Sequence, residues 1–404
     1  MSDIVLPEDQ VDRHATSRIV LVVLDGLGGL PHPSTGRTEL ESATTPNLDA
    51  LAARSSLGML LPVAPGITPG SGPGHLSLFG YDPIRFNIGR GVLSALGVGV
   101  DIRPGDVAAR LNLATFDRSG RVTDRRAGRP SDEEARRVVA KVMEALTQPE
   151  GVEVRLVPEK EHRVVLLLRG EGLGADLTET DPLETGVAAR PVEALSEASE
   201  PTARLLRSVL SEVRGILADE DACNGFLARG FAAFERYPSM DERFGLRGTA
   251  IAKYPMYRGV ARLVGMTVDR IPDSVEGTVE ALESLWDEGN DLHFLHFKDT
   301  DTKGHDGDFD GKVAAIEAVD ALVPRITALA PDVIIFTGDH STPTLYREHS
   351  WHRVPTLLHS RWARPTADNF GERACVGGDL GPIHGTDLIP LALAHAGRLA
   401  KFGA

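Results

Sequence analysis

The chain has 404 residues, more than one ordinary hydrophobic core accommodates, so we expect two domains. Its content of 42% apolar and 25% charged residues is typical of a soluble globular protein. The net charge of −15 argues against a nucleic-acid partner, because a phosphate backbone requires a basic protein surface.

The sequence favours a cytoplasmic protein. Cys223 and Cys375 are its two cysteines, and neither has the CxxC spacing of a redox or metal motif. Residues 1–17 are polar and acidic, without the basic-then-apolar pattern of a signal peptide. We also find no apolar stretch long enough to span a bilayer, so we expect no membrane partner.

The first predicted strand ends in an aspartate. An uninterrupted, β-rich apolar run at 19–24 leads into Asp25-Gly26. Such a run is typical of a strand that is buried on both faces of a parallel sheet. A helix is expected to begin at Thr45-Pro46, where threonine suits the cap and proline suits the first turn.

A segment rich in glycine and proline follows at 62–75, and we expect it to form a loop. Within it, Ser71 lies between two glycines, so its hydroxyl is accessible and the backbone can approach a ligand closely. Beside divalent metal ions such a hydroxyl becomes a nucleophile. Thr68 and Ser77 are the competing hydroxyl groups.

The middle of the chain has a different character, without strands that end in aspartate. Residues 108–130 are polar and rich in arginine, and a helix is expected at about 131–147. Two strand-like runs at 152–157 and 163–169 are expected to form a hairpin. We therefore predict a smaller α+β domain at 108–189, inserted into an α/β core made of 1–107 and 190–404.

Two further apolar runs end in metal-binding residue types. One leads to Asp301-Thr-Lys-Gly-His305, where the glycine is expected to let the backbone turn tightly so that both residues face one ion. The other leads to Asp339-His340, neighbours that can reach different ions at the end of a strand. His349 could supply another nitrogen ligand.

These residues are expected to meet at one edge of the sheet, because ligands bind at the carboxyl ends of strands in open α/β sheets. A lone histidine beside an apolar run is usually structural, which is our expectation for His293 and His296. Three strand ends with acids and histidines instead indicate a metal centre with two ions. Mixed carboxylate and imidazole ligands suit manganese, zinc, iron or cobalt better than calcium, and magnesium remains an option.

Several motifs occur in a fixed order along almost the whole chain. They are LDGLGG (24–29), PGSGPGHLSLFGYDP (69–83), DRRAGR (124–129), YPMYRG (254–259), DTKGH (301–305) and TGDHSTP (337–343). This order resembles the alkaline phosphatase superfamily and, within it, the archaeal-type cofactor-independent phosphoglycerate mutases. The resemblance implies an α/β fold, with a mostly parallel sheet sandwiched by helices in an alkaline-phosphatase-like core and a smaller inserted α+β domain.

The same resemblance implies a two-metal site with Ser71 as the phosphorylated nucleophile. Manganese is the first expectation for both ions, with magnesium, zinc or cobalt as alternatives. The implied ligands are Asp301, His305 and His349 for one ion, and Asp25, Asp339, His340 and the oxygen of Ser71 for the other.

The chain departs from the family pattern in two places. Where the family often has Ser-Asp-Thr-Ala-His, this chain has Ser71-Gly-Pro-Gly-His75. Where the family often has an aspartate, this chain has His352, which makes His352 the main rival of His349 as a ligand.

The implied activity is the interconversion of 3-phosphoglycerate and 2-phosphoglycerate in glycolysis and gluconeogenesis, without bisphosphoglycerate. The planar guanidinium group suits a substrate carboxylate or phosphate. The insert would act as a lid that excludes water. The candidate substrate-binding residues are Arg125, Arg126 and Arg129 in the insert, and Lys253 and Arg258 in the core.

Two other functions are compatible with the same motifs. One is a metal-dependent phosphatase, or another phosphoryl-transfer enzyme of the superfamily, with a different substrate. The other is a non-catalytic protein that binds phosphate or metal on the same scaffold. His75 and His162 are candidates for the general acid and base, and the sequence indicates no oligomeric state.

Overall fold

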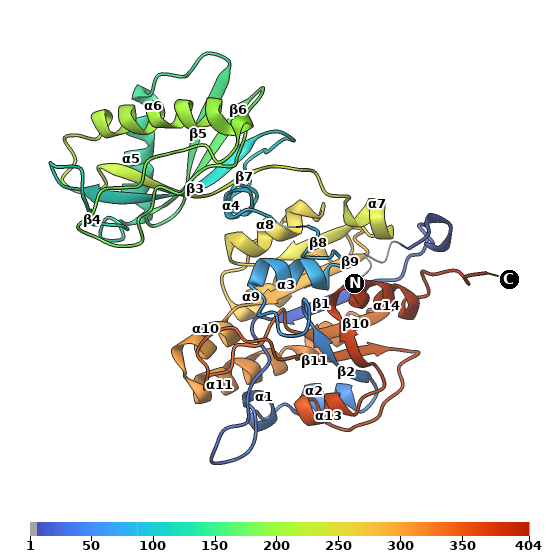
Figure 1. Cartoon of the computed structure of the whole chain (residues 1–404). Coiled ribbons are helices and arrows are strands. Elements are labelled where there is room, and N and C mark those ends of the chain that lie inside the picture. Colours follow the sequence, from blue (N-terminus) through green and yellow to red (C-terminus); the bar gives the residue numbers. More distant parts are fainter. Residues whose placement is uncertain (1–5, 87, 404) are drawn as a thin grey trace. The chain divides into compact units, whose positions relative to one another are not determined.

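The computed structural model describes residues 6–86 and 88–403 and divides the chain into two compact units (Figure 1). Unit 1 joins Met1–Asn87 to Pro238–Ala404, and unit 2 is Ile88–Tyr237. An insert between two segments of a larger unit is therefore present. Each unit has its own apolar core and is described by itself.

The borders of the insert lie outside the expected 108–189. Helices α4 (Arg90–Gly97) and α6 (Glu200–Ile216) and strand β7 (Gly225–Ala233) all belong to unit 2. β7 pairs along a central strand of unit 2, and α6 contributes to its apolar core. The sequence could not show that β7 belongs to the insert, because the alternation of residues within one strand does not reveal which strand it pairs with.

Unit 1 is built on a seven-stranded sheet in the order β12-β2-β11-β10-β1-β9-β8. β11 is antiparallel to both of its neighbours, and the remaining four pairs are parallel, so the predicted mostly parallel sheet is confirmed. The strands are β1 (Ile19–Leu24), β2 (Ser56–Leu61), β8 (Gly248–Ile251), β9 (Leu292–Phe297), β10 (Val333–Thr337), β11 (Val354–Ser360) and β12 (Gly381–His384).

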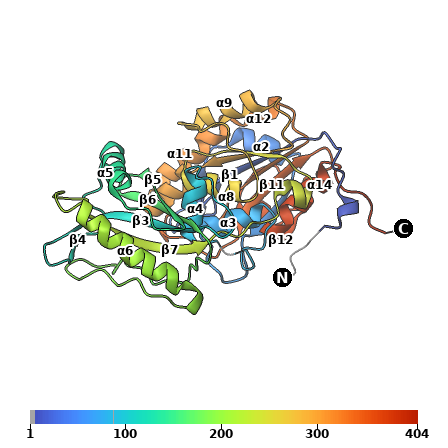
Figure 2. The ribbon, with the colours of Figure 1, turned by 90° about the horizontal axis from the view of Figure 1, so that it is seen from above.

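Helices cover both faces of this sheet, which explains why every residue of β1, β9 and β10 is buried. Figure 2 shows α2, α9, α11 and α12 on one face and α3, α8 and α14 on the other. The helices of unit 1 are α1 (Glu39–Ser42), α2 (Pro46–Ala52), α3 (Ser71–Leu78), α7 (Met240–Phe244), α8 (Pro255–Leu263), α9 (Val275–Leu285), α10 (Asp299–Asp306), α11 (Phe309–Asp320), α12 (Val323–Ala328), α13 (Glu372–Val376) and α14 (Leu388–His395), with short 3-10 turns at Glu8–Gln10 and Gly385–Asp387.

The segment expected to be a loop up to residue 75 becomes helical at Ser71, where α3 begins. Pro73 lies in the first helical turn, where its missing N–H costs no internal hydrogen bond. Gly74 is required by packing, because a Cβ there would lie 2.4 Å from the carbonyl oxygen of Asp339. The glycine therefore serves the close approach of α3 to the Asp339 backbone rather than loop formation. The helix expected at Thr45-Pro46 is present as α2.

Unit 2 contains an antiparallel sheet in which β3 pairs with β4, β6 and β7, and β5 pairs with β6. One face of this sheet packs against α5 and α6. The opposite face carries polar side chains of β3, because residues alternate between faces along a strand. The elements are β3 (Val107–Phe116), β4 (Val122–Asp124), α5 (Asp132–Ala145), β5 (Val152–Lys160), β6 (Arg163–Gly170) and a 3-10 turn at Glu197–Ser199, in addition to α4, α6 and β7. Across the described residues of both units, no helix combines the length and apolarity needed to cross a membrane.

Candidate metal centre and basic pocket

Two groups of acids and histidines lie where β1, β9 and β10 end. These strands are parallel to one another, so their carboxyl ends share one edge of the unit 1 sheet. In each group, one potential ligand atom of every residue lies within 4.8 Å of the others. The Asp301 group is Asp301, His305 and His349, and the Asp25 group is Asp25, Asp339 and His340.

The DTKGH motif forms a helix rather than the expected tight turn. Asp301 and His305 lie one helical turn apart in α10 and therefore on one face of it. Gly304 has a packing role, because a Cβ there would lie 2.3 Å from the carbonyl oxygen of Thr342. That contact brings α10 against the loop that follows β10.

Asp339 and His340 belong to the same group instead of facing different ions. Both residues follow the end of β10 at Thr337, so the alternation of a strand no longer controls their directions. The two groups nevertheless adjoin, because the rings of His340 and His349 stack with centroids 3.6 Å apart. The geometry therefore provides two neighbouring sites.

Backbone carbonyls fix the orientation of two imidazole rings. Nδ1 of His305 lies 3.0 Å from the carbonyl oxygen of Arg347, and Nδ1 of His349 lies 2.8 Å from that of Pro69. A carbonyl only accepts, so each Nδ1 carries the proton and donates it. Nε2 of each ring is left with a lone pair, and each lies 3.5 Å from Asp301 Oδ1.

Thr342 fixes His340 in the same tautomer. Its hydroxyl lies 2.7 Å from Asp301 Oδ1 and 3.0 Å from His340 Nδ1. Because the carboxylate accepts the only hydroxyl proton, His340 Nδ1 donates to the hydroxyl oxygen. Thr342 thereby links the two groups and directs the lone pair of His340 Nε2 toward Asp25 and Asp339.

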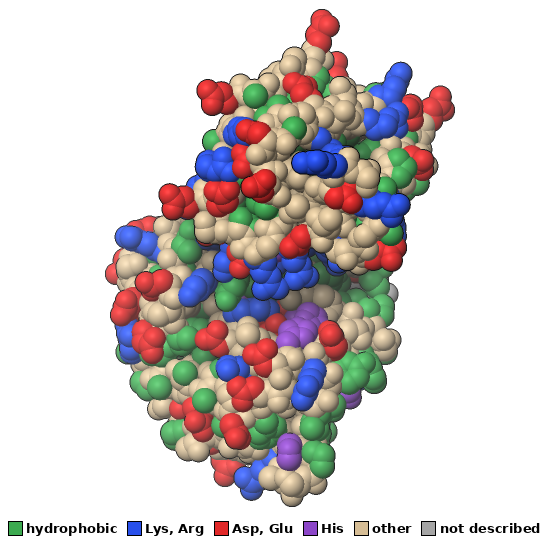
Figure 3. Space-filling view, turned by 90° about the vertical axis from the view of Figure 1, so that its left-hand side faces the viewer, with side chains coloured by type: hydrophobic (Ala, Val, Ile, Leu, Met, Phe, Trp, Pro, Cys, Tyr) green, Lys and Arg blue, Asp and Glu red, His purple; other side chains and the backbone are tan. Residues whose placement is uncertain are grey.

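The donor set fits divalent metal ions. Asp25 and Asp339 are fully buried, and among the described residues Asp25 Oδ1 and Asp339 Oδ2 accept no hydrogen bond, although imidazole nitrogens lie 3.1–3.3 Å from them. Leaving a buried carboxylate oxygen without a hydrogen-bond donor is costly. Carboxylate oxygens combined with imidazole nitrogens suit manganese, zinc, iron or cobalt. Histidine side chains are visible at the surface in Figure 3. His305 of the Asp301 group is exposed to solvent.

The pKa shifts of Asp25, Asp301 and His340 favour metal ligation at neutral pH. Burial opposes ionisation of Asp25, but the Lys298 cation and a hydrogen bond from His296 hold its pKa well below the usual value. Burial is similarly outweighed at Asp301 by its contact with His349, which lowers the pKa of the acid. Burial lowers the pKa of His340. At His349, burial is outweighed by the contacts with Asp301 and with the Pro69 carbonyl oxygen, which raise the pKa, so an ion at the Asp301 group would displace a proton from this ring. Ionised acids and a neutral imidazole are the forms that bind a metal ion.

Ser71 lies beside the Asp25 group as the first residue of α3. Its Oγ is 3.2 Å from His340 Nε2. One turn later, His75 Nδ1 lies 2.8 Å from the Ser71 carbonyl oxygen and 3.1 Å from Asp339 Oδ2, so it ties the serine backbone to this group. Of the competing hydroxyls, Thr68 is exposed and Ser77 is buried.

His352 does not join the Asp301 group. Its Nδ1 lies 3.0 Å from the hydroxyl oxygen of Ser350, and its ring stacks on Trp351. Of the two rivals, the structure therefore places His349 beside Asp301.

Two residues at this centre were missed by sequence reasoning. His296 was expected to be structural, but its Nε2 lies 3.0 Å from Asp25 Oδ2 and its ring stacks on Tyr257. Lys298 contacts acids of both groups. Because Lys298 directly follows β9, the strand-end rule could have found it. The expectation for His293 holds, since it is buried against Trp286.

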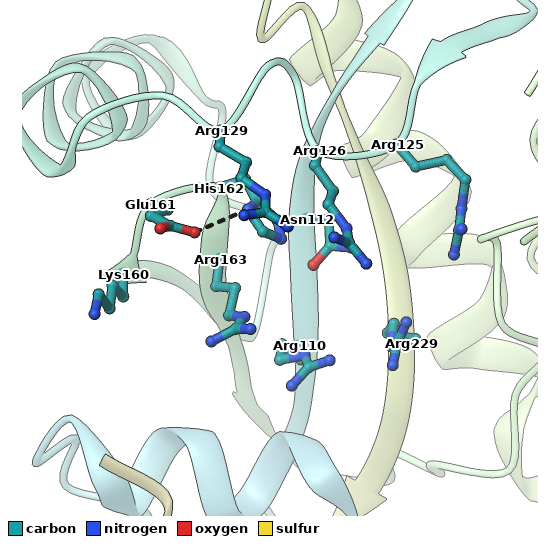
Figure 4. Close-up of a pocket in the computed structure, with 10 residues that line it drawn as sticks. All are labelled: Arg110, Asn112, Arg125, Arg126, Arg129, Lys160, Glu161, His162, Arg163 and Arg229. Carbon is teal, nitrogen blue, oxygen red and sulfur yellow. Dashed lines mark ion pairs between the residues drawn. The ribbon is translucent and has the colours of Figure 1, made fainter. Parts of the chain in front are cut away.

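Unit 2 carries a basic pocket on the sheet face opposite α5 and α6. Its volume is about 360 Å³, and Figure 4 shows arginine side chains converging on it from β3, β6, β7 and the loop after β4. The side chains that line this basic pocket are Arg110, Asn112, Arg125, Arg126, Arg129, Lys160, Glu161, His162, Arg163 and Arg229.

Two arginines of the basic pocket stand directly opposite each other on neighbouring strands. Arg110 of β3 is the register partner of Arg229 of β7, and Nε of each is buried without a hydrogen-bond acceptor among the described residues. Like charges in this position destabilise a sheet. Burial, and then the charge of Arg229, lower the pKa of Arg110 to about 10. An anionic ligand would offset that cost.

The three arginines predicted in the insert differ in their contacts. Arg125 is bound through Nε and Nη2 to both carboxylate oxygens of Asp181, at 2.7 and 2.8 Å. Arg126 and Arg129 line the basic pocket from a loop in which Ala127, Gly128 and Arg129 have φ angles of 46°, 71° and 56°. Left-handed backbone at the non-glycine residues Ala127 and Arg129 is strained, and such strain concentrates at functional sites.

The two substrate residues predicted in the core lie in unit 1. Lys253 follows β8 and lines a second cavity, of about 300 Å³, together with His296 and Lys298. Its Nζ donates to the carbonyl oxygen of Asp273 at 2.5 Å. Arg258 lies in α8 and is half-buried.

The fold and these groups define a mixed α/β protein whose candidate metal ligands lie at the carboxyl edge of a mostly parallel sheet. The family model for 2,3-bisphosphoglycerate-independent phosphoglycerate mutase matches residues 52–222. A Thermus thermophilus protein, named as a probable mutase of this kind, is 53% identical over 96% of both chains. The chain therefore belongs to the 2,3-bisphosphoglycerate-independent phosphoglycerate mutase family, a family of isomerases.

Two solved structures have folds similar to that of this chain. A Pyrococcus horikoshii protein is 30% identical to this chain, with a TM-score of 0.81 over 96% of this chain and 100% of that one. The cofactor-independent phosphoglycerate mutase of Thermoplasma acidophilum is 28% identical, with a TM-score of 0.75 over 94% and 100% of the two chains.

Proposed function

We propose that this protein interconverts 3-phosphoglycerate and 2-phosphoglycerate without bisphosphoglycerate, through a phosphoserine at Ser71. One observation carries the proposal: the Ser71 hydroxyl lies 3.2 Å from His340 at the Asp25 group, in a member of the mutase family. As an enzyme of glycolysis and gluconeogenesis acting on a small phosphorylated acid, it would work in the cytoplasm.

Each group is assigned one divalent ion, with Ser71 Oγ as a further ligand beside Asp25, Asp339 and His340. Manganese is the first expectation, and magnesium, zinc or cobalt are the alternatives. When bound, the ions would lower the pKa of the serine hydroxyl and neutralise charge on the phosphoryl group. The lone pairs of the three oriented imidazoles and the unpartnered carboxylate oxygens support this assignment.

The chain's own contribution is to place the nucleophile. Ser71 Oγ attacks phosphorus in line, so an Oγ–P bond forms while the bond from phosphorus to the glycerate oxygen breaks. That oxygen then takes up a proton, which balances the proton lost by Ser71. In the second half, the other hydroxyl of the retained glycerate loses a proton and attacks phosphorus, and Ser71 Oγ leaves. His75 holds the Ser71 backbone against Asp339 throughout.

Unit 2 is proposed to bind the anionic substrate and to act as the lid that excludes water. The opposed Arg110 and Arg229, together with Arg126 and Arg129, support an anion-binding role for its basic pocket. The planar fork of arginine suits a carboxylate. Arg125 is proposed to act indirectly, by positioning Asp181, because both of its hydrogen bonds go to that acid.

Unit 1 is proposed to contribute Lys253 and Arg258 to substrate binding. Lys253 shares its cavity with Lys298 and His296, both of which contact Asp25. A phosphoryl group between the metal groups and this cavity would meet two ammonium groups. Such fixed charges stabilise a phosphoryl group during its transfer.

The test is a coupled assay with 3-phosphoglycerate, Mn²⁺ and enolase, read as phosphoenolpyruvate formation without bisphosphoglycerate. Ser71→Ala should abolish turnover, and a chelator should do the same. Thr68→Ala, which removes an exposed hydroxyl from the same segment, is the matched control and should retain activity. Release of free phosphate without isomerisation would instead indicate a phosphatase, and metal binding without turnover would indicate a non-catalytic protein.

A further inference from the structure

Lys298 is the one side chain that the described residues show in contact with acids of both metal groups. Its Nζ lies 2.5 Å from Oδ2 of Asp301 and 3.2 Å from Oδ2 of Asp25. The lysine occupies the short connection between β9 and α10, where it is the residue before the first helical position. Its ammonium also lies 5.5 Å over the ring of Tyr257, so its position is defined on several sides.

The ammonium binds only one oxygen of each carboxylate. The other oxygen of Asp301, Oδ1, faces the Nε2 atoms of His305 and His349, each at 3.5 Å. The other oxygen of Asp25, also Oδ1, lies 3.3 Å from Nε2 of His340. In both acids, therefore, the lysine holds Oδ2, here called the outer oxygen, and the histidines of the two metal groups lie beside Oδ1, the inner oxygen.

This division of oxygens matters because a carboxylate can rotate about its terminal bond or bind an ion through both oxygens. An ammonium on the outer oxygen opposes both movements. It leaves the inner oxygen as a single ligand whose direction is fixed. Partners of metal ligands commonly act in this way, and their removal costs about 10–100-fold in metal affinity.

We propose that Lys298 is a positioning residue that couples the two ion sites, by turning one oxygen of Asp25 and one oxygen of Asp301 toward separate ions. The inference rests on the proposed function only in taking both groups as ion sites. His296 provides an internal comparison, because its Nε2 contacts Oδ2 of Asp25 at 3.0 Å and belongs to only one site.

The change in metal affinity on removal of Lys298 has opposite signs for two different roles of this residue. If Lys298 only neutralised the acids in the metal-free protein, it would compete with the ions, and its removal would tighten metal binding. If it positions the carboxylates, removal weakens binding at both sites. The direction of the change in affinity therefore decides the role.

The experiment is calorimetric titration of Mn²⁺ into the full-length chain after chelation and dialysis, without substrate. Lys298→Gln removes the charge and Lys298→Met removes every donor, so either variant carries the test if it folds. Both should lose about 10–100-fold in affinity at each of two sites. Lys298→Arg keeps a cation at the same place and should recover part of that loss. Lys303→Gln is the matched control, because Lys303 lies on α10 but pairs at the surface with Asp308.

Unchanged or tighter binding by Lys298→Gln and Lys298→Met would overturn the proposal, as would a loss confined to one site. Melting curves with and without Mn²⁺ confirm that each variant is folded. A parent chain that bound no Mn²⁺ would overturn the two-ion function itself together with this role. A parent that bound two ions, with variants that bound them equally well, would overturn the role of Lys298 alone.

Discussion

The buried ammonium of Lys312 donates a hydrogen bond to the carbonyl oxygen of Gly26 at 2.9 Å. It donates two more, to the carbonyl oxygens of Thr342 at 2.9 Å and Gly28 at 3.2 Å. Gly26 follows Asp25 after β1, and Thr342 follows His340 after β10. One cation of α11 therefore holds together the two loops that carry the Asp25 group.

We predict that Lys312→Met will destabilise the protein by about 3 kcal/mol, because three buried carbonyl oxygens lose a charged donor. The methionine side chain fills similar volume, so packing changes little. Urea unfolding of the metal-free protein measures the difference in the free energy of unfolding. Lys303→Met, at the surface of α10, should change stability by less than about 0.5 kcal/mol. Equal stability of Lys312→Met and the parent would contradict the role of Lys312 in holding the two loops together.

Thr342→Val tests the hydroxyl that joins the two groups. The substitution keeps the side-chain shape but removes the acceptor for His340 Nδ1 and the donor to Asp301 Oδ1. His340 can then adopt the wrong tautomer, and we expect Mn²⁺ affinity to fall about 10–100-fold. Thr302→Val is the control, because Thr302 is exposed on α10. Titration calorimetry that found unaltered Mn²⁺ affinity would contradict this role.

The strand-end acids were predictable, whereas several of their partners were not. Asp25 and Asp339 follow apolar runs that are buried on both faces, and that pattern is local in the sequence. Thr342 lies within the TGDHSTP motif, but nothing in the sequence shows that its hydroxyl joins His340 to Asp301. Its role arises from the approach of α10 to the loop after β10, which is a tertiary contact.

The basic pocket shows a second limit of sequence reasoning. Arg110 and Arg229 each appear as one arginine in a separate strand, and the pairing register alone makes them neighbours. Composition also misled the assignment of α3, since glycine and proline usually indicate a loop. There the tight contact of Gly74 with the Asp339 backbone outweighs local preference.

Acidification should destabilise the protein through His293, which is fully buried against Trp286. Burial lowers the pKa of His293 from 6.5 to about 4. Between these values the unfolded chain binds a proton that the folded chain does not, so stability falls as the pH falls through this window. We expect this histidine to account for about 2 kcal/mol of lost stability between pH 7 and pH 5.

The measurement is urea unfolding at pH 7 and pH 5 for the parent and for His293→Leu. The leucine variant should lose about 2 kcal/mol less between the two pH values than the parent does. His14→Leu is the control, because His14 is exposed. The same loss in the parent and in His293→Leu would show that this histidine is not the source.

Arg110→Met should separate substrate binding from stability. Removing one of two opposed cations relieves their repulsion, so the free energy of unfolding should stay equal or rise slightly. Substrate binding should weaken, because a charged hydrogen bond is worth about 1.5–3 kcal/mol, which corresponds to about a 10–100-fold rise in KM for 3-phosphoglycerate.

Arg118→Met is the control, because Arg118 is an exposed arginine of the same unit that lies outside the basic pocket. This substitution should change neither KM nor the free energy of unfolding. The enolase-coupled assay and urea unfolding together decide the matter. A stability loss with normal KM would mean that the opposed arginines serve the fold instead of the substrate.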